Sequence, residues 1–198
     1  SAFGRIREEA RRFERLFSRT LPHSDISRLN RAKGATVEIS RDTADLLECA
    51  LSYCADSDGR FDITMGAAVQ LWDLRRAIIP SQDALREAVA HVDWHGVRIW
   101  EECGRHFAQL VDPQAAVDVG GIAKGWIADK FTNALVEAGL VSFLINLGGN
   151  VVAHGEKPGC AAWNIGIRDP LNEGAIVGAV PLRDASAVTS GIYERCCE

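Results

Sequence analysis

The feature that most constrains this fold is that strand-like segments follow one another directly along the chain. Residues 97–100 and 106–111 have strand patterns on either side of a Glu-Glu-Cys-Gly turn, and residues 142–147 and 151–154 flank a pair of glycines. Strict alternation of strands and helices would indicate a doubly wound parallel sheet, whereas runs of adjacent strands indicate an α+β fold or a mixed sheet. The remaining strand patterns cover residues 35–39, 164–167, 176–182 and 187–189.

Four segments carry helix signals. Residues 5–18 have apolar positions three and four apart with charged residues between them. Ser40 is placed to cap a second helix that runs to about residue 55, and Pro80-Ser81 starts a third. The fourth runs from about residue 122 to residue 138. The intervening Ser24-Asp25-Ile26-Ser27 is predicted to be a polar turn.

Composition excludes several classes of protein. The chain has 198 residues, which is the length of one domain. Its 22 Lys and Arg and 27 Asp and Glu give a net charge of −5, unlike a binder of duplex DNA, so no nucleic-acid partner is expected. No apolar run approaches the roughly 20 residues that a membrane span needs, and the charged N-terminus is not a signal peptide. The six scattered cysteines are expected to be reduced.

The segment from Asp118 to Gly125 is the first candidate binding site. Asp118-Val119-Gly120-Gly121 leads into a predicted helix, whose free N–H groups and positive dipole end favour an anion. Lys124 adds a charge one turn into the helix, and Asp118 is able to accept a hydrogen bond from a ligand or to face a metal. The order Lys-Gly-Trp departs from the Walker A motif. The alternative is a tight strand-to-helix turn with a surface lysine.

The second candidate is Arg60-Phe61-Asp62-Ile63-Thr64. Asp62 stands between two bulky apolar residues, where it is able to bind a ligand hydroxyl or ring nitrogen. The alternative is a helix N-cap, in which Asp62 or Thr64 accepts backbone N–H groups ahead of Ala67.

Three further features have less specific signals. The segment 146–150, Asn-Leu-Gly-Gly-Asn, is typical of a bulge or turn and less often of a ligand cradle. The segment 189–193, Thr-Ser-Gly-Ile-Tyr, suits a phosphate or any turn. His91 and His95 are four residues apart, but they stand in a predicted helix exit without a third ligand at motif spacing, so zinc is not expected.

Taken in order, these segments resemble the FAD:protein FMN transferase family, also called ApbE. The resemblance runs from about residue 13 to the end of the chain. It rests on seven blocks in the family's order, namely Ser24-Asp25-Ile26-Ser27-Arg28-Leu29-Asn30, Phe61-Asp62-Ile63-Thr64, Leu71-Trp72, Asp118-Val119-Gly120-Gly121-Ile122-Ala123-Lys124-Gly125-Trp126, Asn146-Leu147-Gly148-Gly149-Asn150, Trp163-Asn164-Ile165-Gly166-Ile167-Arg168-Asp169-Pro170 and Thr189-Ser190-Gly191-Ile192-Tyr193.

The resemblance implies a flavin transferase that uses FAD as substrate and Mg²⁺ as cofactor. Such an enzyme moves FMN from FAD to a Thr or Ser hydroxyl of a target flavoprotein and releases AMP, and some members instead hydrolyse FAD. A helix start, a lysine and a divalent ion suit phosphoryl transfer, which needs positioning and neutralisation of charge. The resemblance assigns Gly121 as a backbone-carbonyl ligand of the metal and assigns no catalytic residue. The residues it assigns to FAD are Arg60, Phe61, Asp62, Asp118 and Lys124.

The implied fold class is α+β, with mixed, mainly antiparallel sheets packed with about four helices, in a single domain over residues 1–198. Compared with the family, the chain is expected to lack a C-terminal segment and the first strand. The alternative functions are a non-catalytic flavin-binding module and a structural remnant that has lost the metal site. The expected partner is a target flavoprotein with an acceptor Thr or Ser, and a homo-oligomer is one option. The family suggests a periplasmic or membrane-anchored location, although no residue of this chain signals export.

Overall fold

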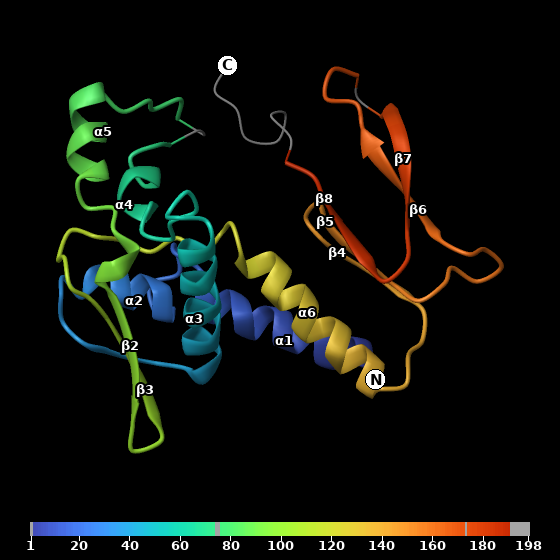
Figure 1. The fold of residues 1–198 in the computed structure, drawn as a ribbon, viewed down its shortest axis with the longest axis horizontal. Helices are drawn as coiled ribbons and strands as arrows, with labels where there is room; N and C mark the ends of the chain where they lie inside the picture. Colours follow the sequence, from blue (N-terminus) through green and yellow to red (C-terminus); the bar gives the residue numbers. More distant parts are fainter. Residues whose placement is uncertain (1, 74–75, 173, 191–198) are drawn as a thin grey trace. The chain divides into compact units, whose positions relative to one another are not determined.

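The computed structural model describes residues 2–73, 76–172 and 174–190. The chain divides into two compact units, drawn together in Figure 1 and described here one at a time. The N-terminal unit is Arg7–Ala123, and the C-terminal unit contains the described residues 2–6 and 124–190. The single domain expected over residues 1–198 stays a prediction, because compactness alone does not decide whether the units fold independently.

The N-terminal unit contains a three-stranded antiparallel sheet of order β1-β3-β2. Its strands are β1 (Val37–Ile39), β2 (Val97–Glu102) and β3 (Arg105–Leu110). Cys103 and Gly104, with φ values of 51° and 73°, form the tight turn between β2 and β3. Two central residues with positive φ are the signature of a turn that matches the twist of a hairpin. The three predicted strands are therefore present, with ends that differ by one or two residues.

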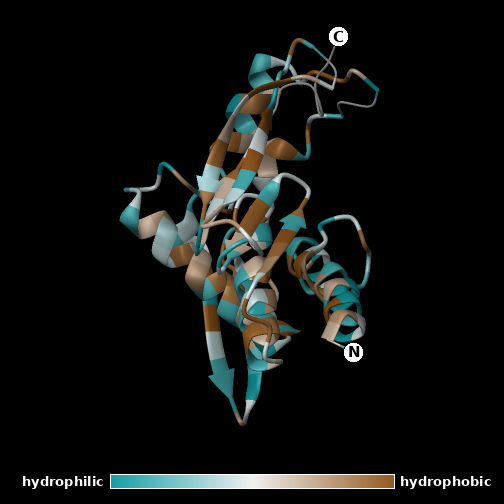
Figure 2. Ribbon diagram, turned by 90° about the vertical axis from the view of Figure 1, so that its right-hand side faces the viewer, coloured by the Kyte–Doolittle hydropathy of each residue, from teal (hydrophilic) through white to brown (hydrophobic). Residues whose placement is uncertain are grey.

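Three of the helices in this part of the chain follow the sequence prediction. They are α1 (Ala2–Phe17), α3 (Arg41–Asp56) and α5 (Gln82–Val89). Ser40 caps α3 and Ser81 caps α5, each by accepting a backbone N–H three residues on. In Figure 2, brown and teal segments alternate along α1, as expected for a helix whose apolar residues recur every three or four positions.

One helix was not predicted and a second was offered only as an alternative reading, so the described residues contain six α-helices where the sequence indicates about four. They are α2 (Asp25–Arg31) and the single turn α4 (Gly66–Val69). The prediction of a polar turn at 24–27 is wrong, because Ser24 caps α2 by accepting a hydrogen bond from the backbone N–H of Ser27 at 3.0 Å. Serine and aspartate favour turns and helix N-caps for the same reason, a short side chain that bonds nearby backbone N–H groups.

The core of the N-terminal unit lies between the sheet and its helices. Ala108 on β3 is fully buried opposite Val37, and the helices α2 and α3 supply the largest share of the buried apolar side chains. The segment that precedes the glycine-rich turn also enters the core, since Val117 is fully buried. The apolar residues of this unit exposed by 1% or less are Ile26, Leu29, Ala44, Leu46, Leu47, Ala50, Cys54, Ile63, Ala108 and Val117.

The C-terminal unit contains α6 (Ala123–Glu137) and a three-stranded antiparallel sheet of order β4-β5-β8. Gly148 and Gly149, with φ values of 59° and 87°, form the turn between β4 and β5, which confirms the turn reading of this glycine pair. The strands of the sheet are β4 (Phe143–Leu147), β5 (Asn150–His154) and β8 (Ala185–Val188).

A separate two-stranded antiparallel hairpin consists of β6 (Trp163–Arg168) and β7 (Ile176–Leu182). The antiparallel pairing of all the named strands in the described residues confirms the predicted α+β class. Part of the 189–193 block, from Gly191 onward, lies outside the described residues, as do Cys196 and Cys197. The other four cysteines are free thiols, at positions 49, 54, 103 and 160.

Candidate functional site

The two candidate segments of the sequence lie side by side in the N-terminal unit. The backbone N–H of Asp118 donates to the carbonyl oxygen of Ile63 at 2.8 Å, and Met65 forms a parallel bridge with Ala116. These contacts join residues 61–66 to residues 116–118, although more than 50 positions separate them in the sequence. The structure therefore brings Phe61, Asp62, Asp118 and Gly121 into one region.

Asp118 has one carboxylate oxygen in the glycine-rich turn and the other in an ion pair. Its Oδ1 accepts a hydrogen bond from the backbone N–H of Gly120 at 2.8 Å, and its Oδ2 lies 3.4 Å from Nε of Arg19. The Asp118 side chain is 21% exposed and that of Arg19 is 41% exposed. An ion pair this open to water contributes little to stability, so a ligand is able to displace Arg19 at small cost.

Gly121 is placed against the ring of Phe61. A Cβ atom built on Gly121 would lie 3.1 Å from Cε2 of Phe61, which is closer than an ordinary carbon contact. The ring itself is half-buried, and the backbone N–H of Phe61 donates to Oγ of Ser57 at 3.0 Å. Two residues that the sequence assigns to ligand binding are therefore in contact with each other.

Both carboxylate oxygens of Asp62 accept hydrogen bonds from within the protein. Its Oδ1 accepts hydrogen bonds from the backbone N–H of Thr64 at 2.7 Å and from the Thr64 hydroxyl at 2.6 Å, and its Oδ2 accepts from the backbone N–H of Trp94 at 3.2 Å. The N-cap reading is wrong in one respect, because the N-cap of α4 is Met65, which has no side-chain cap bond. Asp62 instead closes a turn ahead of that helix. Its flavin role stays a prediction.

Arg60 and Lys124 are both exposed. The backbone N–H of Arg60 donates to the carbonyl oxygen of Ser57 at 3.1 Å, and its side chain is exposed. Lys124 belongs to the C-terminal unit, where its Nζ donates to the carbonyl oxygen of Gly148 at 3.3 Å. In the same unit, Oδ1 of Asn146 accepts the backbone N–H of Gly149 at 3.1 Å.

A pocket of about 470 Å³ with a mixed polar and apolar lining opens beside Asp118 within the N-terminal unit. Its lining includes two arginines, Arg19 and Arg31, and Val117, the residue that precedes Asp118. Positive charge and hydroxyl or amide groups in one concavity suit an anionic ligand. The residues that line it are Arg19, Thr20, Pro22, Ser27, Asn30, Arg31, Gly66, Gln70 and Val117.

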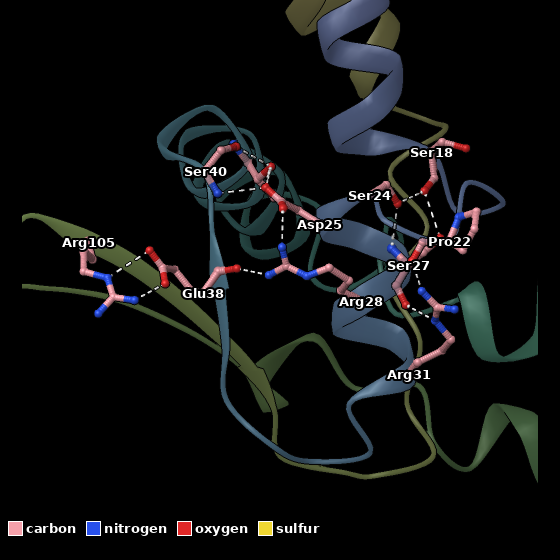
Figure 3. Close-up of polar contacts among 11 residues, drawn as sticks. Ser18, Pro22, Ser24, Asp25, Ser27, Arg28, Arg31, Glu38, Ser40 and Arg105 are labelled. Carbon is pink, nitrogen blue, oxygen red and sulfur yellow. Dashed lines mark hydrogen bonds and ion pairs between the residues drawn. The ribbon is translucent and has the colours of Figure 1, made fainter.

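The α2 wall of this pocket is held by the contacts drawn in Figure 3. Asp25, only 5% exposed, accepts hydrogen bonds from the backbone N–H of Ser40 at 2.8 Å and from the Thr43 hydroxyl at 2.7 Å. At the start of the helix, the hydroxyls of Ser24 and Ser27 both donate to the carbonyl oxygen of Ser18. These buried and part-buried hydrogen bonds fix α2 against its neighbours.

Arg31 is oriented by backbone carbonyls at the pocket. Its Nε donates to the carbonyl oxygen of Ser27 at 3.1 Å and its Nη2 donates to that of Pro22. Sequence reasoning assigned no role to Arg19, Asn30 or Arg31, although Asn30 and the residues before it were part of the family resemblance. Their approach to residues 116–118 depends on tertiary contacts between distant segments, and no local pattern encodes it.

The histidine pair has separate partners. Nδ1 of His91 lies 2.7 Å from Oδ2 of Asp112, whereas Nδ1 of His95 lies 2.7 Å from Oδ1 of Asp93. Within residues 2–73, 76–172 and 174–190, no group of three or more His, Cys, Asp or Glu side chains is arranged to hold a metal ion.

The model of the ApbE family matches residues 3–198 of this chain, and the chain therefore belongs to the ApbE family. The FAD:protein FMN transferase of Treponema pallidum (strain Nichols) is 41% identical to it over 202 aligned residues, which cover 93% of this chain and 55% of that protein. An FAD:protein FMN transferase of Klebsiella pneumoniae (strain 342) is 32% identical, over 98% of this chain and 60% of that protein.

Solved structures show the same fold. The ApbE protein of Thermotoga maritima matches with a TM-score of 0.86 and 28% identity, over 98% of this chain and 63% of that one. The flavin transferase ApbE of Vibrio cholerae matches with a TM-score of 0.79, and at 22% identity this likeness shows the fold alone. The chain spans between 55% and 63% of the length of these four relatives and structures.

Proposed function

We propose that this chain is an FAD:protein FMN transferase, which moves FMN from FAD to a Thr or Ser hydroxyl of a target flavoprotein. The observation that carries the proposal is membership of the ApbE family together with 41% identity to a protein of that name. The site supports it, because Asp118 and the glycine-rich turn stand beside a pocket lined by two arginines. A pyrophosphate is the kind of anion that such groups bind.

The reaction requires positioning more than covalent chemistry by the protein. The acceptor hydroxyl oxygen forms a bond to the phosphorus of the FMN half, the bond from that phosphorus to the AMP oxygen breaks, and the hydroxyl proton leaves to a base or to solvent. We assign Asp118, Phe61, Arg60, Asp62 and Lys124 to holding the FAD. Of the two carboxylates, that of Asp118 is the easier one for a ligand to reach, since the partner of its Oδ2 is an arginine side chain that is 41% exposed, whereas Asp62 is bonded to the buried Thr64 and to the Trp94 backbone.

Magnesium stays a prediction from the resemblance, with the carbonyl of Gly121 as a candidate ligand. Mg²⁺ requires near-octahedral oxygen ligation, and in the part of the chain that the structure describes no group of three or more acidic, His or Cys side chains is arranged to hold a metal. We derive no reaction step through the metal.

The first experiment is a titration of the protein with FAD, with and without Mg²⁺, followed by flavin fluorescence. The transferase proposal predicts binding that tightens with Mg²⁺, and release of AMP when a flavoprotein with an acceptor Thr or Ser is added. Binding that ignores Mg²⁺ and yields no AMP would favour a non-catalytic flavin-holding module. No binding at millimolar FAD would contradict both.

The partner and the compartment are likewise proposed from the family resemblance. A target flavoprotein is the expected partner, and a homo-oligomer and a periplasmic or membrane-anchored location stay predictions. In the described part of the chain, no helix combines the length and the apolar character needed to cross a bilayer.

A further inference from the structure

Asn30 pairs with the backbone of Val117 as a neighbouring strand would. Its Nδ2 donates to the Val117 carbonyl oxygen at 2.8 Å, and its Oδ1 accepts the Val117 backbone N–H at 2.7 Å. Both hydrogen-bonding groups of one peptide residue are thus satisfied by a single side chain that is 87 positions away. The amide group of asparagine has the donor and the acceptor that this pairing needs.

The opposite edge of the same segment is held by other contacts. Successive residues of an extended chain point their N–H and C=O groups to alternate sides. Val117 therefore faces Asn30, while the N–H of Asp118 faces the carbonyl oxygen of Ile63 at 2.8 Å. The peptide before the Asp118 side chain is fixed from both sides, so the carboxylate has little freedom beyond its own torsions.

Asn30 is itself held rigidly. It lies in α2, whose first turn is fixed by the Ser24 cap and by the hydrogen bonds of the buried Asp25 carboxylate (Figure 3). It also lines the pocket together with Val117. A rigid helix thus sets the place of the segment that carries Asp118.

We propose that Asn30 is a positioning residue, which fixes the carboxylate of Asp118 at the edge of the pocket for binding of the nucleotide. This inference rests on the proposed function, because the ligand in question is FAD. Asn30 acts through the Val117 peptide, and its contribution to affinity depends on the presence of the Asp118 carboxylate.

The test compares FAD dissociation constants and unfolding free energies in a double-mutant cycle of Asn30→Ala and Asp118→Ala. We expect Asn30→Ala to weaken FAD binding roughly tenfold, the scale of one charge-assisted hydrogen bond. In the Asp118→Ala background, the same substitution is expected to leave the dissociation constant unchanged.

Gln109→Ala is the matched control, because Gln109 also donates from a side-chain amide to a distant backbone carbonyl, that of Gly34 at 2.6 Å. It is expected to lower stability without changing FAD affinity. Should Asn30→Ala fail to fold, Asn30→Asp takes its place. The aspartate keeps an acceptor and lacks the donor when ionised, so its affinity relative to wild type is expected to recover as the pH falls to about 4 and below, where the carboxyl gains a proton.

Three outcomes overturn the inference. Wild-type affinity in a destabilised Asn30→Ala protein would mean that Asn30 is structural only. Additive losses in the double variant would mean that it acts independently of Asp118. A wild-type protein that does not bind FAD would remove the proposed function and this inference together, whereas the first two outcomes leave the proposed function intact.

Discussion

Gly66 lies directly against the backbone of Ala116. A Cβ atom on Gly66 would come within 2.4 Å of the Ala116 carbonyl oxygen and 2.9 Å of the Val117 carbonyl carbon. The neighbouring Met65 forms the parallel bridge with Ala116, so this close approach is where the two halves of the candidate site meet. A side chain here would have to push apart two backbone segments, which are far less able to yield than the end of a flexible side chain.

We therefore expect Gly66→Ala to destabilise the protein by about 1–3 kcal/mol through overpacking. Urea unfolding followed by circular dichroism measures the change. Gly96→Ala is the matched control, since a Cβ on Gly96 would meet no atom within 4 Å. Equal stability of the two variants would contradict the close approach.

Replacement of Asp118 is expected to affect ligand binding more than folding. Asp118→Ala loses one bond to the Gly120 N–H and a partly exposed ion pair with Arg19, together about 1 kcal/mol of stability. If the carboxylate contacts FAD, the dissociation constant should rise tenfold or more, on the scale of about 1.4 kcal/mol per tenfold. Flavin fluorescence titration measures the dissociation constant. The control is Asp83→Ala, which removes an exposed ion pair on α5. An unchanged dissociation constant in the folded variant would defeat the assignment.

Replacement of Asp62 is expected to affect folding more than ligand binding. Its carboxylate satisfies the hydroxyl of Thr64, which is 0% exposed, and the backbone N–H of Trp94. Asp62→Ala leaves that buried hydroxyl without its acceptor, at a cost of about 1–3 kcal/mol. Thermal or urea unfolding detects the loss, and a cycle with Thr64→Val should recover part of it, because the orphaned hydroxyl is then absent. Full additivity of the two substitutions would show that the hydrogen bond is not formed.

We expect the stability of the protein to depend on pH through the carboxylate of Asp112. The backbone N–H of Gln114 and, next in importance, the ring of His91 hold the pKa of Asp112 below its usual range. A lowered pKa in the folded state means that the carboxylate stabilises the fold above the ordinary value of about 4, and that this stability is lost as the pH falls through the lower folded value. Asp112→Asn should therefore be less stable than wild type at neutral pH.

The measurement is urea unfolding of wild type and Asp112→Asn across a pH series. The difference in unfolding free energy is expected to shrink in the acid range, where the wild-type carboxyl is protonated in both states. Asp83→Asn is the control, because the Asp83 side chain is 91% exposed and its partner lies on the same helix. A difference that stays constant down to about pH 2 would contradict the role of the Asp112 charge.

Local patterns were sufficient for most of the elements. The apolar spacing of α1, the serine caps of α3 and α5 and the Gly148-Gly149 turn all involve residues within a few positions of each other. Helix α2 was missed because Ser24 begins both polar turns and helices with the same hydrogen bond. Whether the segment forms a turn or a helix depends on whether Ile26 and Leu29 are buried by residues from other segments, and a local pattern does not specify that.

The sequence alone determined the family of this protein, because its motifs stand in a fixed order and each is a short run of chemistry-bearing residues. Through that family resemblance it also indicated Asp118, Asp62, Phe61 and Gly121 as site residues, although each motif taken alone is a weak signal. Only the tertiary structure decided which carboxylate is available to a ligand. Asp118 is paired with an exposed arginine, whereas the carboxylate of Asp62 is hydrogen-bonded to Thr64 and to the backbone of Trp94. The physical reason is that a carboxylate's availability depends on which donors surround it, and those donors come from segments that only folding brings together.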